Sequence, residues 1–188
     1  MIFLPTKLQD VREINLNKIG DDRGFFARSF CIDEFNNAGL ESNFVQQNIS
    51  KSSNLHTLRG LHYQVGAYAE NKFIRCHKGS ILDVIIDIRK KSPSFLLYET
   101  FELTEDNYKA LYVPKGFAHG FITLTEEVVV SYLVSSPYSN KNERAIRWND
   151  PVFNIKWPSD NPVLSDKDAK HIDFDSQSKA LDDNYLEI

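Results

Sequence analysis

The stretch Leu58-Arg59-Gly60-Leu61-His62-Tyr63-Gln64 is a predicted strand that also carries reactive groups. Side chains of a strand alternate between its faces, so Leu58, His62 and Gln64 share one face, with Gly60 between them. A histidine on an inner face is either a core group with a satisfied hydrogen bond or a working base. The guanidinium of Arg59 needs an anion, and a phosphate is a natural one. Arg59 and His62 point to opposite faces of a regular strand, so we expect a bulge or twist at Gly60 that turns both towards one cavity.

Length and composition indicate one globular domain over residues 1–188, with about residues 170–188 as a peripheral tail. The 188 residues are 41% hydrophobic and 26% charged, which suffices for a core and excludes a disordered chain. Thirteen Phe and eight Tyr against one Met favour an aromatic, β-rich interior. The 22 basic and 26 acidic side chains are interspersed and sum to −4, which argues against a nucleic-acid partner and against docking to a membrane.

The cysteines and the N-terminus indicate where the chain resides. Cys31 and Cys76 show neither CxxC nor metal-binding spacing, so we expect two reduced thiols in a cytoplasmic protein. The first residues lack a basic segment followed by an apolar one, so no signal peptide is predicted. There is no run of about 18 apolar residues, so no membrane-spanning helix is expected.

Short alternating segments separated by turns predict an all-β fold, a sandwich or a barrel. Over residues 44–50 the alternation places Gln46 and Asn48 on one face, which suits either hydrogen bonding to a polar ligand or a solvated surface. A short helix is predicted over residues 33–38, with Gly39 as its C-terminal stop. Further strands are predicted over residues 25–30, 72–78, 79–89, 95–103 and 128–134.

A second dense stretch, Val113-Pro114-Lys115-Gly116-Phe117-Ala118-His119-Gly120-Phe121, places a histidine after a turn stiffened by Pro114 and Gly116. It resembles the second motif of cupins, small jelly-roll proteins, many of which hold a metal with a His-x-His pair, a Glu and this later His. In this chain no second histidine lies two residues from His62. His62 and His119 alone are too few ligands for a first-row metal, so we expect a cupin-like barrel without metal.

Three other side chains each admit two interpretations. Tyr132 lies in the aliphatic alternation of residues 128–134 and is either a core tyrosine or an acid. Lys72 aligns with apolar neighbours, and is either a lysine that extends its amine to solvent at a strand end or a catalytic cation. Arg23 belongs to the turn sequence Asp21-Asp22-Arg23-Gly24 and is either a solvated turn residue or a phosphate contact.

Several motifs occur in a fixed order along the chain. They are Arg23-Gly24-x-Phe26, Gln46-x-Asn48-x-Ser50, Leu58 to Gln64, Pro114-x-Gly116-Phe117-Ala118-His119-Gly120-Phe121, Trp148-Asn149-Asp150-Pro151, Trp157-Pro158 and Leu164-Ser165-x-Lys167-Asp168. Each motif alone is weak, but the combination is highly specific. With it, the chain resembles the dTDP-4-dehydrorhamnose 3,5-epimerases from about residue 5 to about residue 170.

The resemblance implies a metal-free, cupin-like jelly-roll barrel (a double-stranded β-helix) with short peripheral helices, working as a homodimer without a cofactor. It implies an isomerase that inverts C3 and C5 of dTDP-4-dehydro-6-deoxy-D-glucose to give dTDP-4-dehydro-L-rhamnose for cell-surface polysaccharides. By position, His62 is the proton acceptor, Asp168 orients its ring, Tyr132 returns a proton from the opposite face and Lys72 stabilises the enolate. The implied nucleotide-sugar contacts are Arg23, Gln46, Gln47, Asn48, Arg59, His119, Glu143 and Lys167, with Tyr138 stacked on the base.

The implied reaction agrees with the residues taken on their own. Protons at C3 and C5 are both α to the C4 ketone, so removal of either gives an enolate. That step needs a base that works near neutral pH and a cation where charge develops on oxygen. A carboxylate beside His62 favours the protonated imidazole and makes it a stronger base. Inversion also needs a second donor across the ring, and two arginines suit a pyrophosphate.

Other functions remain open from the sequence. Arg28 stands where the family usually has an acidic residue, which leaves open the exact nucleotide sugar and whether one or both centres are inverted. The first alternative is therefore a related 3-, 5- or 3,5-epimerase of another nucleotide-linked 4-keto-6-deoxy sugar. The others are a non-catalytic cupin that binds a nucleotide or sugar, and a metal-dependent cupin oxygenase or isomerase. A mere binder has no need for the set His62, Lys72, Tyr132 and Asp168.

Overall fold

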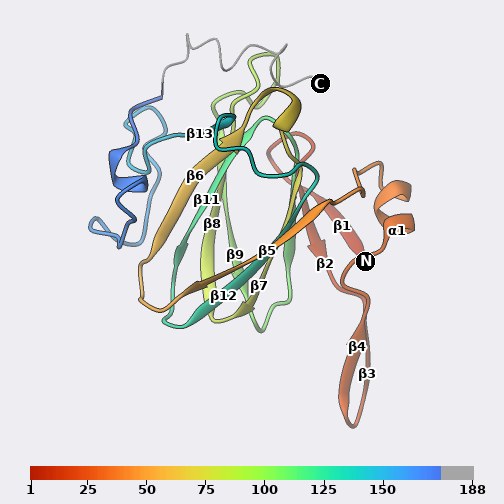
Figure 1. Cartoon of the computed structure of the whole chain (residues 1–188). Coiled ribbons are helices and arrows are strands. Elements are labelled where there is room, and N and C mark those ends of the chain that lie inside the picture. Colours follow the sequence, from red (N-terminus) through yellow and green to blue (C-terminus); the bar gives the residue numbers. More distant parts are fainter. Residues whose placement is uncertain (175–188) are drawn as a thin grey trace.

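The computed structural model describes residues 1–174, and most of its regular secondary structure is antiparallel strand (Figure 1). One sheet has the order β1 (Ile2–Pro5), β2 (Arg12–Asn15), β10 (Ala110–Val113), β7 (Lys72–Lys78), β12 (Val128–Val134) and β5 (Gln46–Ser52). The other has the order β13 (Glu143–Ala145), β6 (Leu58–Gln64), β11 (Phe117–Thr123), β8 (Ser80–Asp87) and β9 (Tyr98–Thr104). The predicted all-β jelly-roll architecture is confirmed.

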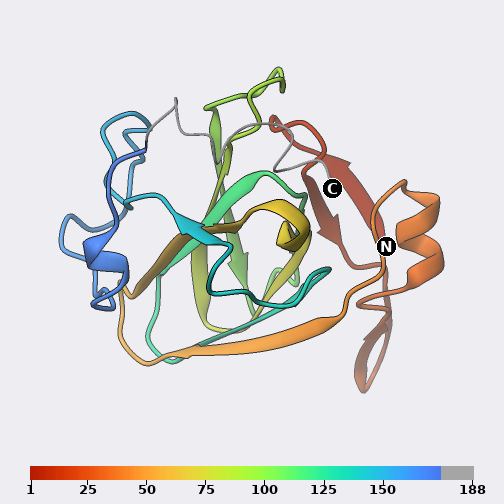
Figure 2. The ribbon, with the colours of Figure 1, turned by 45° about the horizontal axis from the view of Figure 1, so that its top comes forward.

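The two sheets enclose the main apolar core. Ile74 of β7 and Val130 of β12 pack there with Ile85 of β8 and Phe121 of β11, all of them buried. Figures 1 and 2 show the sheets as the opposite walls of a barrel. Each wall is lined by every second residue of its strands, as the alternation in the sequence predicts.

A second apolar cluster lies outside the barrel. Val84 and Ile86 of β8 point away from the main core and pack with Phe153 and Ile155 of the C-terminal segment. The Trp148–Trp157 region therefore returns over the barrel, and β8 is buried on both faces.

Aromatic side chains form a third cluster on the outer face of the six-stranded sheet. Helix α1 (Ile32–Asn37) lays Phe35 against Phe73 and Tyr112, with edge-to-face ring geometry. The helix ends before Gly39, whose φ of +71° is the left-handed conformation of a helix stop. The predicted helix over residues 33–38 is therefore present, displaced by one residue.

Other element boundaries differ modestly from the sequence prediction. The strand predicted over 44–50 begins at Gln46 and continues to Ser52. The strand predicted from residue 95 begins at Tyr98, because residues 92–97 form turns around Asp87. Most of the predicted tail, residues 175–188, lies outside the described residues. Two 3₁₀ turns complete the described chain, η1 (Gly66–Tyr68) and η2 (Asp168–Lys170).

A hairpin of β3 (Lys18–Asp21) and β4 (Gly24–Ala27) projects from the barrel (Figure 1). It exposes Ile19, Phe25 and Phe26. Arg23 lies in its turn, paired with Asp21 and otherwise solvated. Among residues 1–174, none of the helices has the length and hydrophobicity that crossing a membrane requires.

Candidate active site

A cavity of about 420 Å³ opens between the two sheets. One wall comes from β5, β7 and β12 and the other from β6 and β11, with residues of β13 and η2 at the rim. Its polar lining side chains are Gln46, Asn48, Ser50, Arg59, His62, Tyr63, Gln64, Glu70, Lys72, His119, Tyr132, Tyr138, Glu143 and Asp168. Most of the side chains that the sequence singled out therefore meet in this one space.

The irregularity predicted at Gly60 is present. Gly60 has a φ of +115°, and the pairing of β6 with β11 changes register next to it, between His119 and Phe121. The change places Arg59 and His62 on the same cavity. Leu58, which regular alternation assigned to the face of His62, is instead buried away from the cavity. The guanidinium of Arg59 donates to Ser52 Oγ at 3.1 Å and to a backbone carbonyl of β5 at 3.0 Å.

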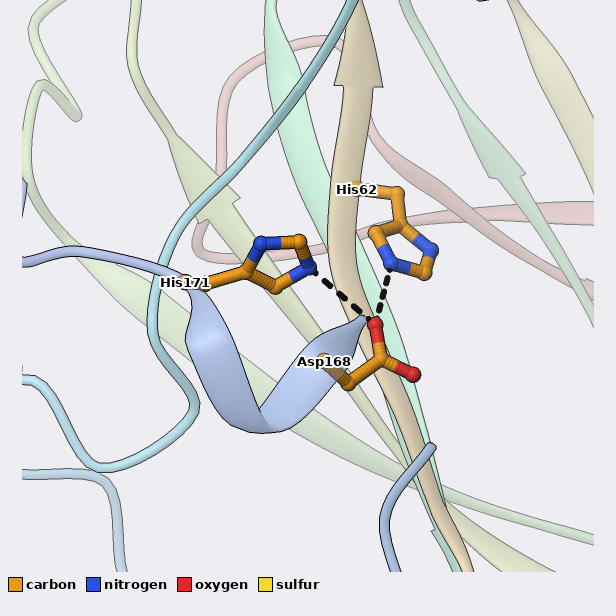
Figure 3. A group of neighbouring side chains, drawn as sticks. All are labelled: His62, Asp168 and His171. Atoms are coloured by element: carbon orange, nitrogen blue, oxygen red, sulfur yellow. Dashed lines mark hydrogen bonds and ion pairs between the residues drawn. The ribbon is translucent and has the colours of Figure 1, made fainter. Parts of the chain in front are cut away.

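His62 is bonded to a carboxylate from a distant part of the chain. Its Nε2 lies 2.6 Å from Oδ1 of Asp168, in the η2 turn (Figure 3). Burial acts to raise the pKa of Asp168, but hydrogen bonds from His62, Ser165 and His171 outweigh it and lower the pKa. The ionised carboxylate accepts the Nε2 proton, so the lone pair of His62 is on Nδ1, which points away from Asp168 (Figure 3). This is the geometry of an oriented base.

His171 also reaches Asp168, a contact that the sequence analysis did not predict. Its Nε2 lies 3.2 Å from the same Oδ1 atom. Within residues 1–174, these three side chains form the group whose possible metal-ligand atoms all lie within 4.8 Å of one another. The contacts of 2.6 and 3.2 Å are hydrogen-bond distances, the first of them short, so hydrogen bonding accounts for the convergence.

Tyr132 and Lys72 come from the wall opposite His62. Burial, with a smaller effect from Glu70, raises the pKa of the Tyr132 phenol, which keeps it protonated. Its hydroxyl makes no hydrogen bond to any described residue. Lys72 is buried, and its Nζ donates to the carbonyl of His62 at 3.2 Å and pairs with Glu70 at 3.3 Å. The cavity therefore holds a base, a neutral acid and a cation.

The rim carries a linked set of polar side chains. Gln46 Nε2 donates to Asn48 Oδ1 at 2.8 Å, and both line the cavity, as the alternation predicts. Tyr138 donates to Glu143 at 3.0 Å, and Lys167 pairs with the same Glu143. Burial acts to raise the pKa of Glu143, but the hydrogen bonds from Lys167 and Tyr138 lower it. The Tyr138 ring is exposed beside these charges, and the hydrogen bond from its hydroxyl to Glu143 holds the ring in place.

His119 also has a carboxylate partner, which the sequence analysis missed. Its Nε2 lies 2.8 Å from Oδ2 of Asp83, a fully buried residue of β8 whose Oδ1 has no partner among the described residues. His119 is the direct cross-strand neighbour of His62. The available signal was that Asp83 and Asp87 interrupt the apolar run Ile81–Ile88, because a charge in a doubly buried strand needs a partner.

Three predicted contacts do not line this cavity, and one of them, Lys167, reaches it only through its ion pair with Glu143. Gln47 alternates with Gln46 and Asn48, so it points to the other face of β5, where it lines a separate cavity with Arg75 and His77. Because successive side chains of a strand point to opposite faces, the alternation alone excludes Gln47 from a site that contains Gln46. Arg23 lies on the projecting hairpin and lines neither cavity of its own chain.

Comparisons with known proteins agree with this architecture. The family model described as dTDP-4-dehydrorhamnose 3,5-epimerase matches residues 5–176. A protein of that name from Shigella flexneri is 44% identical over 93% of this chain and 98% of its own length. A crystal structure of that enzyme from Bacillus anthracis, with TDP and PPi bound, has a TM-score of 0.89 at 40% identity and covers 92% of this chain and 99% of the other. A crystal structure of a dTDP-6-deoxy-D-glucose-3,5-epimerase from Legionella pneumophila, in complex with dTDP-4-keto-L-rhamnose, has a TM-score of 0.83 at 35% identity and covers 89% of each chain.

Proposed function

The chain belongs to the dTDP-4-dehydrorhamnose 3,5-epimerase family, and from that premise we propose that it inverts C3 and C5 of dTDP-4-dehydro-6-deoxy-D-glucose. It is an isomerase, and its product is dTDP-4-dehydro-L-rhamnose. One observation supports the reaction most strongly. An oriented base, His62, and a protonated phenol, Tyr132, line the same cavity from opposite sheets.

The first step is proton removal by His62. Its Nδ1 lone pair takes the proton from the carbon next to the C4 ketone, and the electron pair of that C–H bond moves to make the enolate. Asp168, on the far side of the ring, stabilises the imidazolium that forms. The developing charge on O4 faces the Lys72 ammonium, whose place on the cavity wall is fixed by the His62 carbonyl and Glu70.

The second step is protonation from the opposite face. Tyr132 gives its phenolic proton to the enolate carbon, and the configuration at that carbon is inverted. The buried phenol is protonated at neutral pH and has no competing hydrogen bond to a described residue, so it is available as a donor. Before the second inversion, His62 gives its proton to water and the Tyr132 phenolate takes a proton from water. The two steps then repeat at the second α carbon and complete the reaction.

The rim suits the nucleotide. Arg59 has a guanidinium that β5 holds at the edge of the cavity, where it suits a diphosphate. Tyr138 offers an exposed ring for stacking on a base. The remaining substrate contacts that we propose are Gln46, Asn48, His119, Glu143 and Lys167.

A homodimer would give Arg23 and the exposed apolar surface a role. Val45, just before β5, and Ile49, on its outer face, are 55% and 75% exposed, and β5 is an edge strand. The buried guanidinium of Arg75 beside them reaches only the carbonyl of Ser29, at 3.4 Å, among hydrogen-bond acceptors of the described chain. We propose that a second copy covers this face and that its projecting hairpin brings Arg23 to the cavity of its partner.

Incubation with dTDP-4-dehydro-6-deoxy-D-glucose tests the function directly. Proton NMR of the sugar should show inversion at C3 and C5, and reduction of the product should give the L-rhamnose configuration. Inversion at one centre alone would support the related mono-epimerase instead. The same assay with the UDP-linked sugar tests the nucleotide preference. That preference is open because Arg28, which pairs with Glu34, stands where the family usually has an acidic residue. An unchanged sugar in both assays would refute the proposal.

A further inference from the structure

Asp168 binds two imidazoles through one oxygen atom. Its Oδ1 accepts hydrogen bonds from His62 Nε2 at 2.6 Å and from His171 Nε2 at 3.2 Å (Figure 3). The two rings stand almost perpendicular, 88° apart, with centroids separated by 5.6 Å. The proposed mechanism uses His62 and Asp168 and gives His171 no task.

The other oxygen of the Asp168 carboxylate also accepts a hydrogen bond. Its Oδ2 accepts a hydrogen bond from Ser165 Oγ at 2.9 Å, and Asp168 as a whole is 5% exposed. Burial lowers the pKa of His171, although the hydrogen bond to Asp168 partly opposes that effect, so the ring is neutral near pH 7. A neutral His171 whose Nε2 faces a carboxylate must carry its proton on Nε2.

Several other charged or titratable groups surround the three residues. Lys167 lies beside Asp168 in the chain and pairs with Glu143 of β13. The remaining groups are Lys72 of β7, which donates to the His62 carbonyl, and the Arg147–Asp173 ion pair next to His171. Within the described chain, His171 is the titratable side chain besides His62 that donates to Asp168.

We propose that His171 is a positioning residue that holds the Asp168 carboxylate in place and withdraws part of its charge from His62. This inference rests on the proposed role of His62 as the base. If Asp168 accepted a hydrogen bond from His62 and none from His171, it would stabilise the His62 imidazolium more strongly. His62 would then become protonated, and stop acting as a base, at a higher pH. A protonated His171, 5.6 Å away, disfavours the imidazolium further. Both effects extend the activity towards lower pH.

Imidazole ¹⁵N NMR of the substrate-free wild-type protein tests the geometry without any assay. His171 should be the Nε2–H tautomer at pH 7, and its titration should move the signals of His62. The Nδ1–H tautomer, or a titration that leaves the His62 signals unchanged, would overturn the inference. Because no substrate is present, this result is independent of whether the proposed reaction takes place.

The pH profile of kcat/KM tests the consequence for catalysis. His171→Phe keeps an aromatic ring but removes the donor, and it should move the acid limb upward by about 0.5 to 1 unit. His171→Gln keeps a neutral donor of similar reach, and it should move the limb less than half as far. If both variants lose activity uniformly and the acid limb of the pH profile stays in place, the role of His171 is merely structural. If the acid limb moves equally far in both variants, the donated hydrogen bond is not responsible. A wild-type protein without epimerase activity would refute the proposed function and leave the NMR result to decide the geometry.

Discussion

Gly60 and Gly120 face each other backbone to backbone across β6 and β11. A Cβ atom on Gly60 would lie 2.7 Å from Gly120 Cα, and one on Gly120 would lie 2.6 Å from the Arg59 carbonyl oxygen. Neither neighbour is a side-chain end that can move aside. This contact allows the change of register that brings Arg59 and His62 to one cavity.

Gly60→Ala should therefore destabilise the fold by at least about 2 kcal/mol, from the clash and from a left-handed φ that L residues rarely adopt. Urea unfolding measures the change. Gly20→Ala is the matched control, because its Cβ would meet only a backbone oxygen at 3.5 Å. An unfolding free energy of Gly60→Ala equal to that of the control would contradict the assigned packing.

Arg59→Lys should raise KM for the nucleotide sugar about tenfold or more, with a small effect on kcat. Lysine cannot make the bidentate contact to a diphosphate, and a charge-assisted hydrogen bond contributes about 1.5–3 kcal/mol. Steady-state kinetics separate the two parameters. A fall in kcat with KM unchanged would place Arg59 at the reacting carbons rather than at the diphosphate.

Arg23→Ala and His62→Ala should each be nearly inactive alone and regain activity when their subunits are mixed and allowed to exchange. In a mixed dimer one site has its own His62 and the partner's intact hairpin, so ~25% of all sites become complete in a random mixture. The measurement is kcat/KM before and after exchange. No gain in a mixture shown to contain mixed dimers would mean that the hairpin serves its own barrel.

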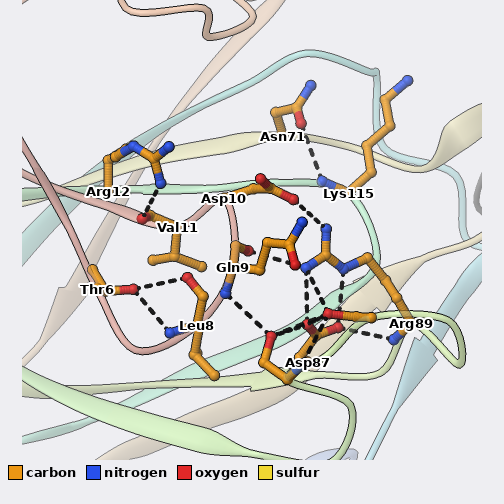
Figure 4. A network of polar contacts seen from close by, with 12 residues as sticks. Thr6, Leu8, Gln9, Asp10, Val11, Arg12, Asn71, Asp87, Arg89 and Lys115 are labelled. Carbon is orange, nitrogen blue, oxygen red and sulfur yellow. Dashed lines mark hydrogen bonds and ion pairs between the residues drawn. The ribbon is translucent and has the colours of Figure 1, made fainter.

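Asp87 anchors the N-terminal segment to the barrel (Figure 4). Burial acts to raise the pKa of this carboxyl, but hydrogen bonds from Arg89, Ser92 and Ser94 lower the pKa below its ordinary value. A carboxyl with a lowered pKa stabilises the fold above its unfolded pKa, and the contribution is lost as pH falls through the folded pKa. Its effect should be constant from pH 7 down to about pH 5 and should shrink below about pH 4.

Asp87→Asn should consequently lose about 3 kcal/mol of unfolding free energy at pH 7, and the gap from wild type should narrow below about pH 4. Urea titrations at several pH values between these limits check it. Asp21→Asn, in an exposed pair with Arg23, should leave the urea midpoint nearly unchanged. A gap that widens in acid would contradict the assignment.

Periodicity predicted the barrel and most of its lining well. Alternation in β5, β7 and β12 placed Gln46, Lys72 and Tyr132 on inner faces, where the structure has them. Gly60 signalled the bulge because a regular strand could not bring Arg59 to the side of His62. These features depend on local spacing, which the sequence displays.

The misses depend on contacts that are distant in sequence. Alternation does not reveal that the C-terminal segment covers the face of β8 that carries Val84 and Ile86. For that reason it does not show that Asp83, on the other face, points into the barrel. His171 lay in a segment with weak patterning, and only the η2 turn brings it to Asp168. Arg23 stays a predicted contact, because its motif does not tell which copy of the chain it serves.

The separate roles of His62 and Tyr132 are tested most directly by deuterium exchange. In deuterated water, wild-type protein should exchange and invert the substrate at C3 and C5, followed by NMR. His62→Ala should lose both exchange and inversion by about 10²–10⁴-fold, the loss typical of a general base. Tyr132→Phe keeps the ring, the base and the Lys72 cation, so the enolate should form and take up deuterium mainly from the His62 side. Exchange without full inversion is the predicted result, and wild-type inversion at both centres in Tyr132→Phe would contradict the account.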